Sequence, residues 1–441
     1  MRLRLRNIAV ILFAVVLSSC EKDRFDFSPS GREITVPEPM TRVDSPDVRN
    51  VTMLYSSGFN DLYNSLLGDI MELERGFIPT AQYPTDPVLL VFSRNSKGLD
   101  YSRLSAPVLF RMYKRDGKVV RDTLKRWEPG DKASDAAVFG EALTFMYKHY
   151  PANGYGLIFS SHATGWLPEG YYQSPSKFEN SSFDSSISWL PRLNAAPEYP
   201  EIDPMEEPRV RSVGRDEFSN GTFDEMEIPD MVSAIPFKLD YILFDACLMG
   251  CVEVAYALRE KTDLIGFSQA EVLAAGYNYE TITEHLLKRE PDPVAVCRDY
   301  FDFYNSNSGS AQSATISVID TRKIEGLASL CKELFETYRT PISALNENSG
   351  VQGYFRFNRH FFYDLEDILV KAGISETDKA RLSEALSQCV VYKAATPRFL
   401  SFQIRTHCGL SMFLPSAGGS WIRDYYRNNV EWNKDTELLL Q

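Results

Sequence analysis

The sequence predicts an α/β protein, an α/β/α sandwich with a central, mostly parallel sheet and a smaller α+β C-terminal part. Short runs of apolar, β-branched and aromatic residues, such as 155–159 and 241–244, are typical of strands buried on both faces of a parallel sheet. Apolar residues at helical spacing follow the second run, from Leu248 onward. Hydrophobic residues make up 44% of the 441, which permits a large core.

Strands and helices are expected to alternate along most of the chain. Strands are predicted at residues 51–56, 88–92, 107–113, 155–161, 241–244, 264–268 and 314–319. Helices are predicted at residues 61–74, 134–149, 280–288, 293–307 and 322–338, with others beginning near 230 and 248. Ser134 is the expected N-cap of the second helix. Such alternation is typical of a sheet with helices on both faces, and we assign it to a domain at 49–340.

Residues 341–441 differ in pattern and are expected to form a C-terminal accessory region. Helices are predicted at 364–372 and at 376–388, the second capped by Ser375. Strands are predicted at 390–393, 399–404 and 410–414.

The N-terminus resembles a bacterial lipoprotein signal. Three arginines precede an apolar run at 8–17, which is too short to span a bilayer. The following Leu-Ser-Ser-Cys sequence predicts cleavage of residues 1–20 before Cys20 and lipidation of that cysteine, with an ordinary secretory peptide as the alternative. Residues 21–48 are then a tether. We expect a cell-envelope protein, lipid-anchored in the outer membrane or at the cell surface of a Gram-negative bacterium.

Composition excludes several classes of function. The net charge of −13 argues against nucleic-acid binding, which needs a basic surface. We find no nucleotide-binding glycine motif, zinc-protease helix motif or serine-hydrolase motif, and no Cys or His spacing typical of zinc, so no cofactor or metal is expected. Six cysteines follow Cys20, enough for three disulfides, but a free-thiol role for one of them argues against full pairing.

The free thiol is Cys247. The segment Asp245-Ala246-Cys247 lies where a predicted buried strand ends and a helix is expected to begin. In open α/β sheets, ligands bind at such carboxyl ends. A helix N-terminus there would favour the thiolate form. The alternative is a cysteine that acts as a small buried hydrophobic residue.

His162 is the candidate base among five histidines, because it too follows a predicted buried strand. If the two strands are parallel neighbours, His162 and Cys247 lie at the same edge of the sheet, the arrangement of a Cys/His acyl-transfer enzyme. A structural histidine is the alternative. His407 and Cys408 form a second candidate pair, although they precede a predicted strand.

Three motifs resemble those of the clostripain family of cysteine peptidases, peptidase family C11. The segment 245–250, followed by 253–256, is similar to the nucleophile motif of the family. The segment 161–166 is similar to its histidine motif, and 53–62 to its first strand and turn. The similarity covers roughly residues 50–320. Ala163 departs from the pattern, because glycine usually follows the histidine.

The resemblance implies a caspase-like fold and a cysteine endopeptidase that acts on protein or peptide substrates. Cys247 would be the nucleophile and His162 the general base and acid, as a dyad without a third member. The N–H groups of Ala163 and Cys247 would hold the oxyanion. The long insert at 167–236 joins the two motifs, and enzymes of this type are often cleaved in that connection; its basic residues are candidate cleavage sites, namely Lys177, Arg192, Arg209, Arg211 and Arg215.

The resemblance also makes Asp245 one wall of a pocket for a substrate Arg or Lys. The family usually supplies a second acid on the loop after the next strand, where Ala275 is the aligned residue and Glu271 lies further back. We therefore expect only a weak preference for Arg or Lys at the P1 position. A helix cap is the alternative role for Asp245. The rival functions are a different thiol acyltransferase, or a weakly active or inactive surface-anchored homologue that acts as a binding protein.

Overall fold

The structure, a computed structural model, describes residues 50–80, 86–96, 103–171, 216–218, 223–356 and 361–440. All of them belong to one compact unit, residues 34–441. The predicted signal peptide, its Cys20, the tether, and the candidate cleavage sites of the insert lie outside the described residues.

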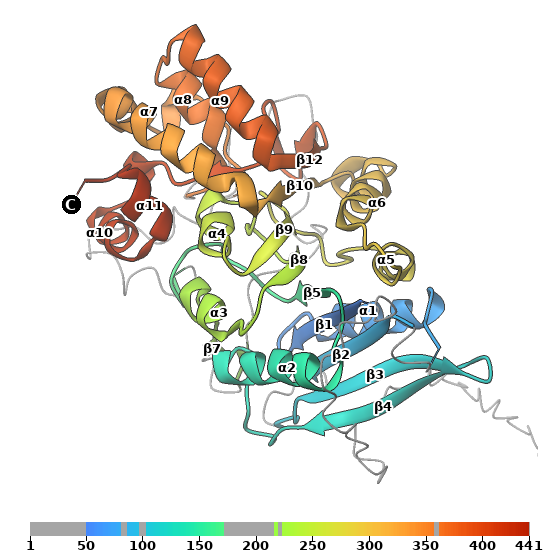
Figure 1. The fold of residues 1–441 in the computed structure, drawn as a ribbon. Helices are drawn as coiled ribbons and strands as arrows, with labels where there is room; N and C mark the ends of the chain where they lie inside the picture. The colour runs from blue at the N-terminus through green and yellow to red at the C-terminus, as the bar shows by residue number, and fades with distance from the viewer. Residues whose placement is uncertain are drawn as a thin grey trace, which may run out of the picture. The chain divides into compact units, whose positions relative to one another are not determined.

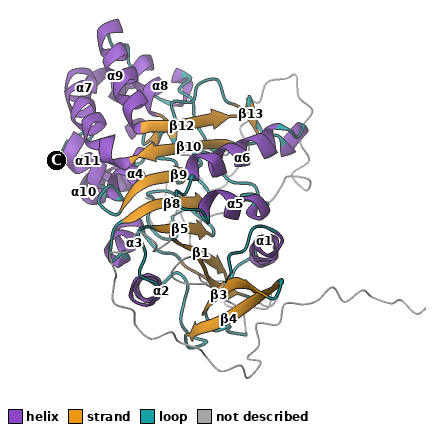
Figure 2. Ribbon diagram, turned by 45° about the vertical axis from the view of Figure 1, so that its right-hand side comes forward, coloured by secondary structure: helices purple, strands orange, loops and turns teal. Residues whose placement is uncertain are grey.

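A nine-stranded sheet forms the centre of this unit, in the order β12-β10-β9-β8-β5-β1-β2-β3-β4 (Figures 1 and 2). The strands are β1 (Val51–Gly58), β2 (Val88–Asn95), β3 (Val108–Arg115), β4 (Lys118–Arg126), β5 (Tyr155–Ser160), β8 (Leu239–Asp245), β9 (Thr262–Phe267), β10 (Thr315–Asp320) and β12 (Val390–Ala395). Neighbours from β2 to β9 pair in parallel, and the pairs on either side are antiparallel. Every residue of β1, β2 and β5 is buried, as their apolar runs predict.

Helices cover both faces of the sheet (Figure 2). On one face lie α1 (Tyr63–Arg75), α5 (Tyr279–Leu286) and α6 (Pro293–Asn305). On the other lie α2 (Ala136–His149), α3 (Ile228–Ala234), α4 (Val252–Ala257) and α7 (Ile324–Ala344). This arrangement confirms the predicted α/β/α sandwich with a central, mostly parallel sheet.

The C-terminal residues are joined to this sandwich. They form α8 (Leu365–Lys371), α9 (Glu376–Cys389), α10 (Ser420–Asn429) and α11 (Glu431–Thr436), with short strands β11 (Tyr363–Asp364), β13 (Arg398–Phe399), β14 (Phe402–Gln403) and β15 (Ser411–Met412). Strand β12 extends the central sheet beside β10.

The C-terminal residues also contact α4 through a buried carboxylate. The backbone N–H of Phe413 and the hydroxyl of Tyr426 both donate to Glu253 of α4, each at 2.8 Å. Burial raises the pKa of Glu253 to about 7, and these two hydrogen bonds oppose the rise. The division into a domain at 49–340 and an accessory region at 341–441 stays a prediction.

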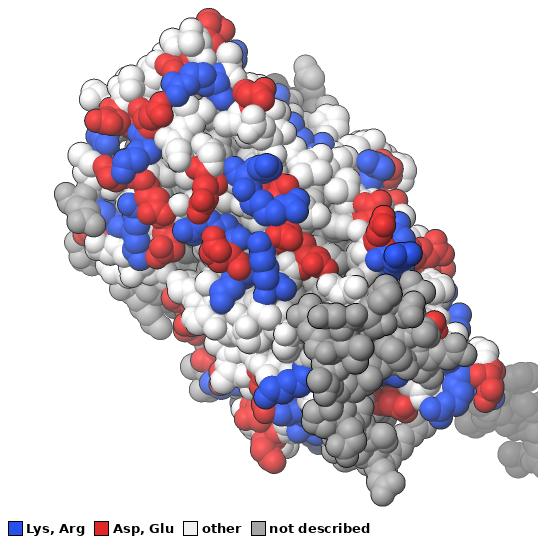
Figure 3. Space-filling view, viewed as in Figure 1, with Lys and Arg blue, Asp and Glu red and all other residues white. Residues whose placement is uncertain are grey.

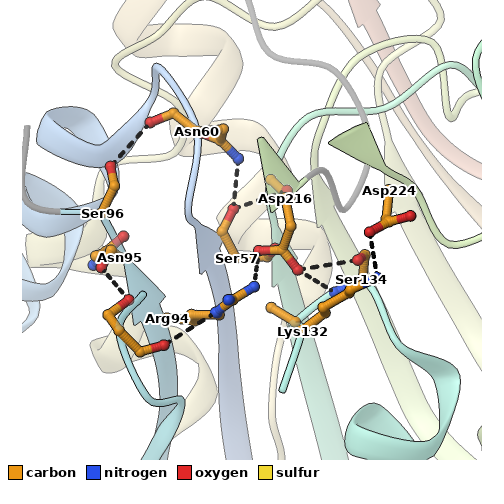
Figure 4. Close-up of polar contacts among 12 residues, drawn as sticks. Ser57, Asn60, Arg94, Asn95, Ser96, Lys132, Ser134, Asp216 and Asp224 are labelled. Atoms are coloured by element: carbon orange, nitrogen blue, oxygen red, sulfur yellow. Dashed lines mark hydrogen bonds and ion pairs between the residues drawn. The ribbon is translucent and has the colours of Figure 1, made fainter. Parts of the chain in front are cut away.

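A buried ion pair ties Asp216, in the C-terminal part of the insert, to the sheet (Figure 4). The Arg94 guanidinium lies 2.7 Å from an Asp216 carboxylate oxygen, and both side chains are fully buried. The backbone N–H and the hydroxyl of Ser134 donate to the other oxygen of Asp216, each at 3.0 Å. The prediction that Ser134 is the N-cap of α2 is wrong. The N-cap is Asp135, whose side chain accepts a hydrogen bond from the N–H of Ala137.

Charged residues of both signs are interspersed on the face shown in Figure 3. Exposed charges of opposite sign pair with one another elsewhere in the described chain too, such as Arg381 with Glu333 at 2.6 Å and Lys332 with Glu437 at 2.6 Å. This face therefore offers no broad patch of a single sign, and its exposed ion pairs contribute little to stability.

Removing Asp216 should be costly, because it leaves the Arg94 charge buried without its carboxylate. We expect Asp216→Ala to lower the free energy of unfolding by about 3–5 kcal/mol. The matched control is Asp224→Ala, which breaks the partly exposed Lys132–Asp224 pair and should cost less than about 1 kcal/mol. Urea denaturation measures both, and equal losses would contradict the assigned role of the buried pair.

Candidate active site

The central feature of the site is a pair of adjacent parallel strand ends. Strand β5 pairs in parallel with β8, and Ser160 lies opposite Asp245 in this register. The pairing continues one step further, where the N–H of Ser161 donates to the carbonyl of Asp245 at 3.4 Å. His162 and Cys247 each follow the paired residues by two positions. The two residues therefore emerge side by side at the carboxyl edge of the sheet.

The loops after these strands touch. Gly165 has a φ of +63°, which favours glycine. A Cβ placed on Gly165 would lie 2.8 Å from the carbonyl oxygen of Leu248 and 2.6 Å from the Phe362 ring. Leu248 itself has a φ of +60°, uncommon for a bulky residue, directly after the candidate nucleophile. Strain of this kind is concentrated at functional sites.

Cys247 is covered by the loop that follows β9. The N–H of Val272 lies 3.2 Å from Sγ and donates to it, and the carbonyl oxygen of the same residue is 3.8 Å away. Cys247 itself is 1% exposed. The expected helix N-terminus beside the thiol is wrong, because α4 begins only at Val252, with Cys251 as its N-cap. Between Cys247 and α4, the backbone is hydrogen-bonded to the loop after β9, where the N–H of Gly250 donates to the carbonyl of Ser268 at 2.7 Å.

His162 has a close acidic neighbour that the sequence analysis missed. Its Nε2 lies 2.5 Å from Oδ1 of Asp61, in the turn between β1 and α1. The His162 side chain is 5% exposed and that of Asp61 is 51% exposed. A signal was present, because Asp61 follows a buried strand end just as His162 and Cys247 do, and β1 is the other neighbour of β5.

Ala163 does not need the conformational freedom of glycine. Among the described residues, the non-glycine residues with positive φ are Asp116, Leu248, Leu400 and Glu437. The left-handed position of the histidine loop is instead occupied by Gly165. The replacement of glycine by alanine after His162 is therefore compatible with the backbone found here.

The candidate pocket residues lie in different surroundings. Asp245 is fully buried, and its carboxylate accepts from the hydroxyls of Tyr279 at 2.8 Å and Ser160 at 3.4 Å. It is not the cap of α4, so the alternative role for Asp245 is wrong. Ala275 is exposed.

Glu271, on the same loop as Ala275, is buried and already paired with a cation. Its carboxylate lies 3.2 Å from the Nε of Arg356. Glu271 directly precedes Val272, whose backbone holds Cys247 Sγ. The ion pair therefore fixes the loop that covers the thiol.

The second candidate pair has the features of structural residues. Nε2 of His407 lies 2.7 Å from the side-chain oxygen of Gln269, and burial lowers the pKa of His407 to about 3. The Cys408 thiol donates to the carbonyl of Leu410 at 3.0 Å, and burial raises its pKa well above the usual value. A neutral imidazole and a protonated thiol do not form the ion pair that a nucleophilic cysteine needs.

The described part of the chain holds neither a cluster of metal ligands nor a membrane-spanning helix. It contains no group of three or more His, Cys, Asp or Glu side chains arranged to hold a metal ion. None of its helices is both long and apolar enough to cross a bilayer. The six cysteines described are all free thiols.

A cysteine and a histidine at neighbouring carboxyl ends of a parallel sheet are the arrangement expected of a Cys/His acyl-transfer enzyme. The model of the clostripain family, Peptidase_C11, matches residues 201–438, more than half of the chain. The chain belongs to the clostripain family, and it is a cysteine endopeptidase.

Solved structures of C11 proteases have the same fold. An inactive zymogen from Parabacteroides distasonis is 24% identical, with a TM-score of 0.70 over 89% of this chain and 99% of that one. A secreted protease from Bacteroides thetaiotaomicron, bound to an irreversible peptide inhibitor, is 22% identical, with a TM-score of 0.69 over 88% of this chain and 99% of that one. No curated protein matches the chain.

Gly165→Ala tests whether the contact between the two loops matters. The substitution places a methyl group against the Leu248 carbonyl at a positive φ, so we expect a loss of about 2–4 kcal/mol in the free energy of unfolding. Gly350→Ala is the control, because Gly350 has a φ of +69° but open space around it, and should cost only about 1–2 kcal/mol. Chemical denaturation compares the two, and peptidase activity should fall only in Gly165→Ala. Unchanged activity in that variant would show that the loops act independently.

Proposed function

We propose that this chain is a lipid-anchored endopeptidase of the cell envelope that cleaves protein or peptide substrates with a Cys247/His162 dyad. The observation that carries the proposal is the register of β5 and β8, which pairs Ser160 with Asp245 two residues before each member of the dyad. Family membership supports a thiol peptidase, and the register supports these two residues as its catalytic groups.

In the proposed reaction, the Sγ proton of Cys247 passes to Nδ1 of His162, because Nε2 faces Asp61. The thiolate attacks the scissile carbonyl carbon, and the N–H groups of Cys247 and Ala163 hold the oxyanion that forms. The C–N bond breaks as the imidazolium returns its proton to the leaving amine. A water molecule, deprotonated by the neutral imidazole, then hydrolyses the thioester to a carboxylic acid and the free thiol.

Substrate binding has to displace the cover over the nucleophile. Cys247 is held by the Val272 backbone and is 1% exposed, so a scissile carbonyl cannot reach Sγ while the loop keeps this position. The Arg356–Glu271 pair stabilises that position. Activity therefore requires the loop after β9 to shift.

For the P1 side chain, we propose a weak preference for Arg or Lys, with Asp245 and Ala275 lining the pocket. Asp245 is an anionic group two residues before the nucleophile. The Tyr279 hydroxyl already donates to it, and Ala275 brings no charge. A single carboxylate that shares its hydrogen-bonding capacity with a phenol attracts a substrate cation less than two carboxylates would.

The envelope location rests on the N-terminal sequence. The basic segment, the apolar run at 8–17 and Cys20 support lipidation and membrane attachment through Cys20. The structurally similar Bacteroides thetaiotaomicron protease is described as secreted, which is compatible with export of this chain.

Substitution of either dyad residue tests the proposed chemistry. Cys247→Ala and His162→Ala should each abolish cleavage of a peptide library while the protein stays folded, with a cooperative thermal transition. Cys251→Ala is the matched control, a second buried cysteine four residues on, and it should lose about 1–3 kcal/mol of stability but keep its turnover. Turnover retained in Cys247→Ala or His162→Ala would refute the assignment.

The pocket assignment is tested by changing its charge. Ala275→Asp should raise kcat/KM for cleavage after Arg, because a second carboxylate favours a cationic side chain. Asp245→Asn should reduce cleavage after Arg more than cleavage after neutral residues. Matched peptides that differ only at P1 provide the measurement. A parent enzyme that cuts only after neutral or acidic residues would contradict the pocket.

A further inference from the structure

We propose that Asp61 is a positioning residue that orients the His162 imidazole and stabilises its protonated form during proton transfer. The proposal rests on the dyad proposed above and adds to it a third residue. In this assignment Asp61 acts through His162 and takes no part itself in bond making or bond breaking.

The contact fixes which ring nitrogen does the chemistry. Oδ1 of Asp61 lies 2.5 Å from Nε2 of His162. An ionised carboxylate can only accept hydrogen bonds, so Nε2 carries the proton that it donates to Asp61. In the neutral ring, Nδ1 is then the basic nitrogen and receives the thiol proton. Asp61 thus selects the tautomer and the orientation that the dyad needs.

The backbone that carries Asp61 is held by buried polar contacts (Figure 4). Asn60 is fully buried; its side-chain nitrogen donates to the Ser57 carbonyl at 3.1 Å, and its side-chain oxygen accepts from the N–H of Leu62 at 2.9 Å. The N–H of Glu217 donates to the carbonyl of Phe59 at 2.8 Å. The turn is therefore fixed on both sides of Asp61. The Asp61 carboxylate points toward His162, while about half of the side chain stays exposed to solvent.

The exposure of Asp61 separates a role in catalysis from a role in stability. Its side chain is 51% exposed, whereas that of His162 is 5% exposed. Because water screens the half-exposed Asp61 carboxylate, its contact with the ring contributes little to the folded state, about 0–1 kcal/mol. When the thiol proton moves to the ring, the imidazolium gains a carboxylate at hydrogen-bonding distance, and that gain is realised only during the reaction. The carboxylate itself takes up no proton, the same division of roles as in a Ser-His-Asp triad.

The chain contains a matched pair away from the site. Nε2 of His285 lies 2.7 Å from Oδ2 of Asp299, with side chains 25% and 39% exposed. This pair joins α5 to α6 and has the same chemistry, with an aspartate that is also partly exposed and a histidine that is more exposed than His162. Asp299 is therefore a control for the general effect of removing an aspartate from a histidine.

The experiment measures kcat and KM separately in Asp61→Ala, Asp61→Asn and Asp299→Ala, together with the melting temperature. We expect Asp61→Ala to lower kcat on the order of 10–100-fold with KM within about twofold, because an interaction made in the transition state is lost. Asp61→Asn keeps an acceptor oxygen without the charge and should recover part of that loss. Asp299→Ala should leave both constants unchanged, and all three variants should melt close to the parent.

The outcomes separate this proposal from the dyad. A kcat of Asp61→Ala within twofold of the parent, a loss confined to KM, or an equal loss in Asp299→Ala would overturn the role of Asp61. If His162→Ala, assayed in parallel, abolishes turnover while Asp61→Ala does not, the dyad stands and Asp61 alone is refuted. If His162→Ala retains turnover, the dyad itself fails, and the role of Asp61 fails with it.

Discussion

The parallel pairing of β5 with β8 is the constraint on which the site depends. Side chains alternate between the two faces of a sheet, so a slip of one residue would send one member of the dyad to the opposite face. The register of Ser160 with Asp245 prevents this, and the buried apolar residues of both strands fix the register. The loops beyond the strands then meet where Gly165 approaches the Leu248 carbonyl. The geometry of the site therefore follows from burial of the sheet.

Much of the fold could be predicted, because its central strands are buried on both faces and are read as apolar runs. The hairpin strand β4 was missed: it lies at the sheet edge, where charged residues interrupt the pattern and protect the edge from further pairing. The Asp116-Gly117 turn, with both φ values positive, is a hairpin signal that was available. Helices α10 and α11 were also missed.

The candidate site was predicted in part. Cys247 and His162 were found because each follows a short apolar run that predicts a buried strand, which is a local signal. Asp61 was missed because its partner is 101 residues away, and only the strand order shows that β1 lies beside β5. The expected helix dipole at Cys247 was wrong because helical spacing from Leu248 does not reveal the extended backbone that precedes Val252. Glu271 was judged too distant, and its pairing with Arg356 involves a segment 85 residues further along.

The most direct test of this account is to ask which cysteine is the nucleophile. The parent protein would be treated with a peptidyl acyloxymethyl ketone carrying Arg at P1, and the modified residue located by peptide mapping with mass spectrometry. We expect one equivalent of label, on Cys247, and loss of that label in His162→Ala. Label on Cys408 or on another thiol, or label on Cys247 that is independent of His162, would contradict it.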